Sequence, residues 1–278
     1  MGVVGVLILL ASLAPRRVRA GDGVWTLTSE ALWGLYVTQL VASPNFAADS
    51  TLFAATEEGI FRSADGARHW EPMNRGLAHL RVSSLAISPD YSNDRTLFAA
   101  LADGGVYRSV DGGEHWTASW AGMVPPWNPD GQLVQVSGLG FSPSFADDNT
   151  LFASSWNDPI FKSVDGGATW TMLSSDAGPL SGQIEISPSY ATDGTIFVTR
   201  ALMADGIYKS TDGGATWERL MPTLPDQDLW QLAISPDYGA DHTLFVRTER
   251  ALFRSEDGGA TWTHSSVGIV IDPDAALV

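Results

Sequence analysis

Short apolar runs, rich in β-branched and aromatic residues, recur along the chain between polar turns. In one stretch the runs are Ser84–Ser88, Thr96–Leu101, Val106–Ser109 and His115–Ser119, separated by Pro, Gly, Asp or Asn. Runs of this kind predict β-strands. None shows the 3.6-residue apolar spacing of an amphipathic helix. The pattern therefore predicts an all-β protein built from units of four short strands.

The four-strand unit repeats five times. The string Ser-x-Asp-Gly-x-x-x-Trp occupies residues 63–70, 109–116, 163–170, 210–217 and 255–262, with starts 46, 54, 47 and 45 residues apart. Upstream of each copy stands a second string, Ser-Pro-x-Phe/Tyr-x-x-Asp-x-Thr-Leu/Ile-Phe, as in residues 88–98. Four strands per roughly 45 residues is the repeat of a β-propeller blade. We expect a single β-propeller of four-stranded blades.

The repeated polar residues suit turns. An aspartate before glycine can accept backbone N–H groups in the hairpin between the third and fourth strands, and the glycine allows a positive φ. The closing tryptophan is large enough to hold that hairpin against the blade. These predicted structural residues are Asp65, Asp111, Asp165, Asp212 and Asp257, with Trp70, Trp116, Trp170, Trp217 and Trp262. A second series is expected to cap the first hairpin: Asp49, Asp94, Asp148, Asp193 and Asp241.

The string resembles the Asp-box, or BNR repeat, over five copies from Ser63 to Trp262. Proteins with Asp-boxes include sialidases, xyloglucan-active glycosidases, sortilin-type receptors and photosystem II assembly-factor propellers. The resemblance implies that the box is a fold element in the turn between the third and fourth strands. It implies a propeller and leaves the function open.

Both ends of the repeat region carry strand-like remnants. Val24–Thr28 resembles the strand that follows an Asp-box, residues 268–273 resemble a first strand, and residues 275–278 part of a second. These pieces predict a composite sixth blade, closed by both termini, without a recognisable third strand. The alternative is a fragment of a larger propeller. A closed ring would remove exposed sheet edges.

Residues 1–20 are typical of a targeting segment. The apolar run Val3–Ala14 is shorter than the roughly 20 residues that span a bilayer, and Val18-Arg19-Ala20 is a small-residue cleavage pattern. The positive charges follow the run instead of preceding it. We expect a signal peptide at 1–20 and a mature domain at 21–278, secreted, at the cell surface or in the periplasm, without a transmembrane span. A tethered or unprocessed form is the alternative.

The amino-acid composition limits the classes of partner and cofactor that we expect. The 278 residues carry a formal net charge of −16 and no cysteine, which excludes disulfides and Cys-ligated metals. Only two residues, Lys162 and Lys209, are lysines. Such acidity opposes a phosphate backbone, so no nucleic acid partner is expected. No zinc or phosphate-loop motif occurs, and neither a metal nor a cofactor is predicted.

Candidate binding residues lie in the variable connections and on three strands. Aromatic rings beside carboxylates suit sugar or peptide binding, although rings that pack between blades are the alternative. A carboxylate on a first strand must be paired or face water, and two arginines are candidate partners for Glu185. The candidates are Trp120, Trp127, Asp130, Trp156, Asp158, Glu185, Arg200, Trp230 and Arg247.

Two functions follow from these features. The first is a non-catalytic binding or scaffold module for a protein, peptide or glycan, which uses its variable loops. The alternative is a glycoside hydrolase of sialidase-like or xyloglucan-active type, which needs two suitably spaced carboxylates. Carboxylates are plentiful in the loops, but the Arg-Ile-Pro segment of sialidases does not occur. No catalytic residue is assigned.

Overall fold

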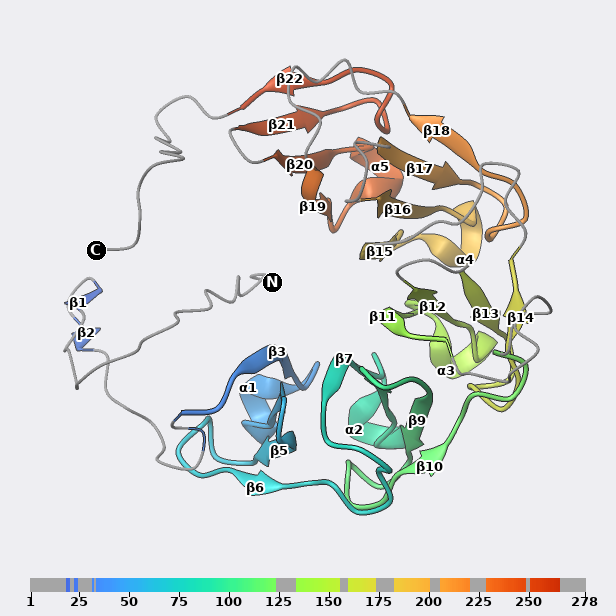
Figure 1. Cartoon of the computed structure of the whole chain (residues 1–278). Helices are drawn as coiled ribbons and strands as arrows, with labels where there is room; N and C mark the ends of the chain where they lie inside the picture. The colour runs from blue at the N-terminus through green and yellow to red at the C-terminus, as the bar shows by residue number, and fades with distance from the viewer. Residues whose placement is uncertain are drawn as a thin grey trace.

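The computed structural model describes residues 19–20, 23–24, 32, 34–123, 134–155, 160–173, 183–200, 206–220, 229–248 and 251–265. Within them, five antiparallel sheets of four strands each follow one another along the chain. The sheets stand around a common centre, with the first strand of each nearest to it and the fourth outermost (Figure 1). This radial arrangement is that of propeller blades, as the sequence predicts.

Each sheet uses its four strands in chain order. The first strands are β3 (Val37–Ala42), β7 (Val82–Ile87), β11 (Val136–Phe141), β15 (Gln183–Ile186) and β19 (Leu229–Ile234). The second strands are β4 (Leu52–Thr56), β8 (Leu97–Leu101), β12 (Leu151–Ser155), β16 (Ile196–Arg200) and β20 (Leu244–Thr248). The third strands are β5 (Gly59–Ser63), β9 (Val106–Ser109), β13 (Phe161–Ser163), β17 (Gly206–Ser210) and β21 (Leu252–Ser255). The fourth strands are β6 (Glu71–Pro72), β10 (Thr117–Ala118), β14 (Thr171–Met172), β18 (Glu218–Leu220) and β22 (Thr263–His264).

A single helical turn joins the first two strands of every sheet, which the strand pattern did not predict. The five turns are α1 (Phe46–Asp49), α2 (Tyr91–Asp94), α3 (Phe145–Asp148), α4 (Tyr190–Asp193) and α5 (Tyr238–Asp241). Each ends at a residue in the left-handed conformation, such as Ser50 with φ of 52° or Gly194 with φ of 59°. Four residues are too few to show a helical period, which is why the sequence pattern missed them.

Bulge residues bind the first strands of the first three sheets to one another. The register of β3 shifts between Val37 and Gln39, which leaves Thr38 out of the ladder. Its hydroxyl donates to the carbonyl of Val82 on the neighbouring first strand at 3.1 Å. The Ser83 hydroxyl of β7 likewise donates to the carbonyl of Val136 on β11 at 2.8 Å. The bulges therefore connect successive blades close to the centre of the propeller.

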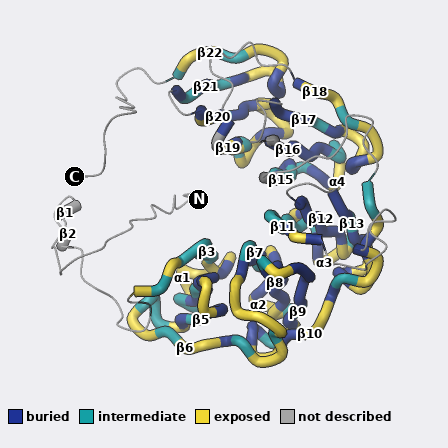
Figure 2. Tube along the Cα trace, in the orientation of Figure 1, coloured by how far each residue is buried: buried dark blue, intermediate teal, exposed yellow. Residues whose placement is uncertain are grey.

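The core lies between successive sheets. The second-strand phenylalanines Phe53, Phe98, Phe152 and Phe197 are fully buried. Each faces the next sheet, and Phe53 packs edge-to-face on Tyr91 of α2 with ring centroids 5.8 Å apart. Figure 2 shows the burial concentrated in the second strands, such as β8 and β12, whereas the outer strands β6, β10 and β22 are exposed. Burial of apolar surface between blades is the main stabilising contribution.

The composite sixth blade stays a prediction. One of its expected residues, Val24, falls in the described part, where β2 (Gly23–Val24) pairs with β1 (Arg19–Ala20) in a two-stranded sheet. The rest of Val24–Thr28 and the segments 268–273 and 275–278 lie outside the described residues. Within the described part of the chain, no helix is long and apolar enough to span a membrane.

Candidate functional site

The Asp-box turns hold their carboxylates in a repeated set of hydrogen bonds. In the third box, Ser163 Oγ donates to Asp165 Oδ1 at 2.8 Å, and the Thr169 N–H donates to the same oxygen at 2.9 Å. The Thr169 hydroxyl donates to Oδ2 at 2.6 Å. Gly167 N–H donates to Ser163 Oγ at 2.9 Å. The other four aspartates make the same bonds, with histidine in place of threonine in the first two boxes.

These bonds keep the box carboxylates ionised. Hydrogen bonds from the Thr216 side chain and backbone lower the pKa of Asp212 to about 2. Hydrogen bonds from the Thr261 side chain and backbone likewise lower the pKa of Asp257 to about 2. In Asp111, slight burial acts to raise the pKa, but bonds from His115 outweigh it and the pKa falls to about 2. A general acid in glycoside hydrolysis needs a raised pKa instead. These carboxylates therefore suit turn stabilisation.

The second aspartate series holds the helical turns. Asp94 Oδ2 accepts from Ser88 Oγ at 2.6 Å, and Oδ1 accepts from the Thr96 N–H at 2.7 Å. The two turns of a blade are also joined, because the Gly112 N–H of the box donates to the carbonyl of Arg95 at the end of α2 at 3.0 Å. Equivalent bonds occur in all five sheets. One face of the propeller is thus occupied by repeated, mutually bonded turns.

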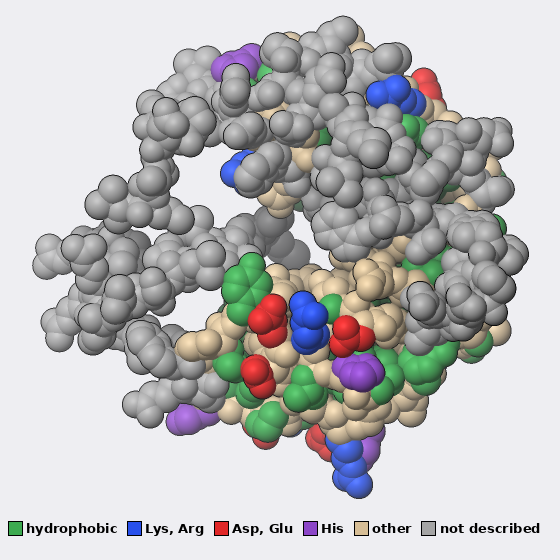
Figure 3. All heavy atoms as spheres, viewed as in Figure 1, with side chains coloured by type: hydrophobic (Ala, Val, Ile, Leu, Met, Phe, Trp, Pro, Cys, Tyr) green, Lys and Arg blue, Asp and Glu red, His purple; other side chains and the backbone are tan. Residues whose placement is uncertain are grey.

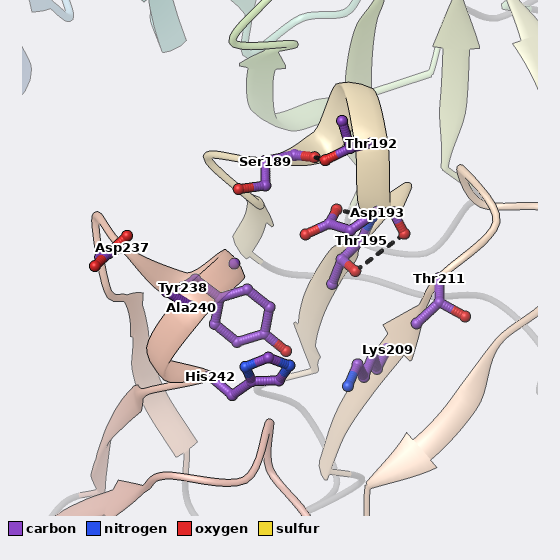
Figure 4. Close-up of a pocket in the computed structure, with 11 residues that line it drawn as sticks. Ser189, Thr192, Asp193, Thr195, Lys209, Thr211, Asp237, Tyr238, Ala240 and His242 are labelled. Carbon is purple, nitrogen blue, oxygen red and sulfur yellow. Dashed lines mark hydrogen bonds between the residues drawn. The ribbon is translucent and has the colours of Figure 1, made fainter.

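A cleft of about 430 Å³ opens on this repeated face between α4 and α5. Figure 4 shows Tyr238 and His242 from the α5 side and Lys209 from β17 around it. The Tyr238 hydroxyl is buried without a hydrogen-bond partner, and burial raises the pKa of this tyrosine to about 12. Much of the remaining lining, such as Asp193 and Thr195, belongs to the repeated turns. The cleft therefore lies at the contact between the fourth and fifth sheets.

The opposite face carries the non-repeated connections, and its described part over the first two sheets forms a mixed surface. We call this the loop surface. It consists of six exposed residues: Tyr36, Glu57, Glu58, Leu80, Arg81 and Asp103. Tyr36 and Leu80 are exposed by 55% and 42% respectively, which is unusual for large apolar side chains. Figure 3 shows hydrophobic, acidic and basic side chains side by side on the face turned to the viewer.

Backbone hydrogen bonds hold the loop surface in place. The Glu57 N–H donates to the carbonyl of Tyr36 at 3.3 Å, and the Ala102 N–H donates to that of Arg81 at 2.8 Å. The turn after β4 is fixed by Thr56 Oγ1, which donates to the carbonyl of Gly59 at 2.9 Å and accepts from the Glu58 N–H at 3.0 Å. A rigid backbone under exposed aromatic and charged groups lowers the entropic cost of binding.

The aromatic rim that the sequence predicts, Trp120, Trp127, Asp130, Trp156 and Asp158, is only partly within the described chain. Trp120 is half-buried between the second and third sheets, with its ring centroid 5.1 Å from that of Tyr107. This is the packing arrangement that the sequence left open as the alternative. The other members of the rim lie outside the described residues: Trp127, Asp130, Trp156 and Asp158. Their role in binding stays a prediction.

The predicted polar trio, Glu185 with Arg200 and Arg247, is distributed over two sheets. Glu185 lies half-buried on β15 opposite Phe197 of β16, and Arg200 ends β16. Arg247 is exposed on β20 of the next sheet, opposite Gln231. Trp230 stands at the register shift of β19, where the first two sheets have Thr38 and Ser83. The pairing of Glu185 with the arginines stays a prediction.

The structure adds three loop-surface residues that the sequence did not single out, Tyr36, Leu80 and Arg81. Tyr36 directly precedes β3, and its only sequence signal is an aromatic residue just before a first-strand run. Whether such a residue packs or faces water depends on the neighbouring sheet. Among the described residues, no group of three or more His, Asp or Glu side chains could hold a metal ion.

Comparison with known proteins agrees with this geometry. A sequence profile described as BNR/Asp-box repeat matches residues 208–219, which run from β17 through the fourth box into β18. Solved structures that superpose on the chain are propeller proteins. The chain therefore has a β-propeller fold and contains a BNR/Asp-box repeat. No curated protein matches it in sequence.

Three solved structures illustrate the range of similar proteins. An ancestral GH74 enzyme is 19% identical with a TM-score of 0.65, over 83% of this chain and 31% of that one. YCF48 from Cyanidioschyzon merolae is 14% identical with a TM-score of 0.57, over 83% and 71%. The extracellular domain of a hybrid two-component system from B. thetaiotaomicron is 14% identical with a TM-score of 0.58, over 83% and 30%.

YCF48 has also been solved bound to D1 peptide, and that structure is 15% identical with a TM-score of 0.58 over 88% of this chain and 72% of that one. By contrast, this Asp-box propeller spans 31%, 37% and 38% of the three GH74 structures it matches, about a third of their length. At these identities the similarity shows the fold alone.

Proposed function

We propose that this Asp-box propeller is a binding module that holds an extended peptide segment of a partner protein across its loop surface. The observation that carries the proposal is the exposure of Tyr36 and Leu80 on a backbone fixed by hydrogen bonds. An exposed tyrosine that is held in place is a typical anchor for a partner, and an exposed leucine adds apolar area to the contact.

Charge on the loop surface suits a peptide. Glu57, Glu58 and Asp103 are exposed in the same connections of the first two sheets as Tyr36 and Leu80, and Arg81 adds one positive charge. A peptide with basic and apolar residues could therefore pair with the carboxylates and cover Tyr36 and Leu80 at once. The net charge of −16 would speed its approach. The peptide-bound YCF48 structure supports the same use of a single propeller. Secretion, predicted from residues 1–20, would place this binding outside the cytoplasm.

The test is selection of random 12-residue peptides on the immobilised full-length protein, followed by affinity measurement. We expect selected peptides to be basic and apolar, and Tyr36→Ala to weaken their binding at least about tenfold, since a buried aromatic anchor contributes about 1.4 kcal/mol or more. The matched control is Val110→Ala, because Val110 is 58% exposed on the Asp-box face. It should bind like the wild type.

Equal binding by wild type and Tyr36→Ala would refute this location for the site. A glycan array and a xyloglucan hydrolysis assay run beside the selection cover the alternatives. If no peptide is selected and a glycan binds saturably, the ligand is a carbohydrate instead of a peptide. If reducing sugar is released in the absence of peptide binders, the carbohydrate is a substrate. The Trp127→Ala variant, tested in the same assays, examines the predicted aromatic rim.

A further inference from the structure

The cleft between α4 and α5 is open because of a glycine. The turns α2 and α3 end at Arg95 and Asn149, and each of these side chains lies beside a glycine of the Asp-box in its own sheet. The turn α4 ends at Gly194 instead. A side chain at Gly194 would meet the carbonyl of Thr211, which lines the cleft, at 3.0 Å. The fourth sheet thus lacks the side chain that covers the box in the second and third sheets.

A buried hydroxyl in the cleft has no hydrogen-bond partner. Tyr238 of α5 is 3% exposed, lines the cleft, and makes no hydrogen bond through Oη. Figure 4 shows this hydroxyl beside His242, on the side of the ring that faces Lys209. Burial, with the nearby negative charge of Asp193, raises the pKa of Tyr238 to about 12, so the hydroxyl keeps its proton at neutral pH. An unsatisfied buried donor destabilises the fold, and an acceptor atom of a ligand would remove that cost.

The Lys209 ammonium group lies next to this hydroxyl. Both groups flank the same glycine of the fifth box, because a Cβ atom on Gly258 would be 3.0 Å from Lys209 Nζ and 3.1 Å from Tyr238 Oη. Within the described residues, Lys209 Nζ donates one long hydrogen bond, 3.4 Å to the carbonyl of Gly258, and forms no ion pair. Two convergent donors, one of them charged, suit a carboxylate.

An unpaired carboxylate lines the cleft on the other side of the tyrosine. Figure 4 shows Asp237 and Lys209 on opposite sides of that ring. In α2 the equivalent Asp90 accepts a hydrogen bond from the Asn93 amide at 2.5 Å. The turn α5 has Ala240 at the position of Asn93, so Asp237 lacks this donor. Among the described residues, the exposed Asp237 carboxylate has neither a hydrogen-bond donor nor an ion-pair partner.

These charges select the class of ligand. An anion bound at Lys209 would be repelled by Asp193, by Asp237 and by the net charge of −16. A cation bound at Asp237 would leave Lys209 and the tyrosine hydroxyl without an acceptor. A zwitterion satisfies both ends of the cleft and approaches without net charge. The cleft volume of about 430 Å³ is within the range of about 300–1,000 Å³ that is usual for small-molecule sites.

We propose that this cleft binds a dipeptide or an amino carboxylate of similar length. The carboxylate of the ligand accepts hydrogen bonds from Tyr238 and Lys209, and its ammonium group pairs with Asp237. The rings of Tyr238 and His242, whose centroids are 5.5 Å apart, lie against the atoms between the two charges. The site is on the Asp-box face, opposite the loop surface, and does not depend on the peptide site proposed there.

The first test measures the Tm of the full-length protein with alanyl dipeptides Ala-X, one for each amino acid X. We expect at least one dipeptide, at ten times its Kd, to raise the Tm by about 3 °C. The N-acetylated and C-amidated forms of that dipeptide each lack one charge and should raise the Tm much less. No shift with any dipeptide, or equal shifts with the capped forms, overturns the proposal.

Two tyrosine variants test the site itself. Tyr238→Phe removes only the unpartnered hydroxyl, so it should keep the fold and raise the Kd of the dipeptide at least about tenfold in isothermal titration calorimetry. The matched control is Tyr190→Phe, because Tyr190 is the equivalent residue of α4 and packs on Phe152 of the third sheet. It should bind like the wild type. An unchanged Kd in Tyr238→Phe, or an equal loss in both variants, contradicts the proposed site.

A third variant fills the cleft and leaves both donors in place. Gly194→Asn copies Asn149 of α3, which adopts the same left-handed conformation with φ of 49°. This variant should fold, as judged by circular dichroism, and lose dipeptide binding. Tyr36→Ala changes the loop surface and should leave the Kd of the dipeptide unchanged. Binding that survives Gly194→Asn, or that is lost in Tyr36→Ala, would place the dipeptide elsewhere and overturn the cleft as its site.

Discussion

At the scale of single residues, this propeller is dominated by local turn chemistry. Each Asp-box carboxylate accepts hydrogen bonds from residues within four positions of it, such as Ser163 and Thr169 around Asp165. Such bonds need no distant partner, so the sequence string alone is enough to predict them. The string also shows where a box departs from the pattern. The first box has Ala67 where the other four have glycine.

Ala67 is expected to be a strained position. Its φ is 71°, in the left-handed region that costs an L-residue with a side chain about 1 kcal/mol or more. Ala67→Gly should therefore stabilise the protein by about 1 kcal/mol, measured as a raised denaturation midpoint in urea with an unchanged slope. The reverse change at the equivalent position of the second box, Gly113→Ala with φ of 92°, should destabilise it. A loss of stability in Ala67→Gly would contradict this account.

At the scale of elements, contacts between blades decide what a side chain does. Trp120 is in a variable connection and could bind a ligand by its sequence position alone. In the structure it packs against Tyr107 and against the cores of two neighbouring sheets. The sequence could not separate these outcomes, because the ring's neighbours come from other units of the chain.

We therefore expect Trp120→Ala to act mainly on stability. Loss of a half-buried indole between two blades should cost about 2–3 kcal/mol, somewhat less than for a fully buried one. Chemical denaturation measures this cost, and peptide affinity is measured below the unfolding transition. Retained stability together with lost peptide binding would instead make Trp120 a ligand contact, as the sequence also allowed.

At the scale of the whole molecule, two electrostatic effects act on the stability of the fold. One comes from the five ionised box aspartates and the other from the large net negative charge. The pKa values of Asp111, Asp212 and Asp257 are about 2, well below the value of about 3.9 in an unfolded chain. A carboxylate with a lowered pKa in the folded state stabilises that state above the unfolded pKa. This contribution is lost as the pH falls from about 4 to 2.

Acid is therefore expected to unfold the protein after first stabilising it. Between pH 7 and about 5, partial neutralisation reduces the self-repulsion of the −16 charge and should raise the Tm. Below about pH 4 the box aspartates become protonated and the Tm should fall steeply. Circular dichroism melts from pH 7 to 2 measure both limbs, and Asp212→Asn should have a shallower acid limb than the wild type. A constant Tm from pH 5 to 2.5 would refute the role of these carboxylates.

The sequence by itself determined the repeating unit, the four strands in each unit and the turn carboxylates. All of these depend on residues within about fifty positions of one another, and local hydrogen bonds and strand patterns act over that range. It missed the helical turns α1 to α5, which are too short to show a period, and the exposure of Tyr36.

Tertiary structure alone decided which side chains of each sheet are covered by the next one. It buried Phe53 and Phe197 completely, left Phe245 and Phe46 partly exposed, and placed Tyr36 and Leu80 on one fixed surface. The physical reason is that these positions have nearly the same sequence surroundings in every repeat. Their burial is set by the neighbouring sheet, and that neighbour exists only once the repeats are arranged in space.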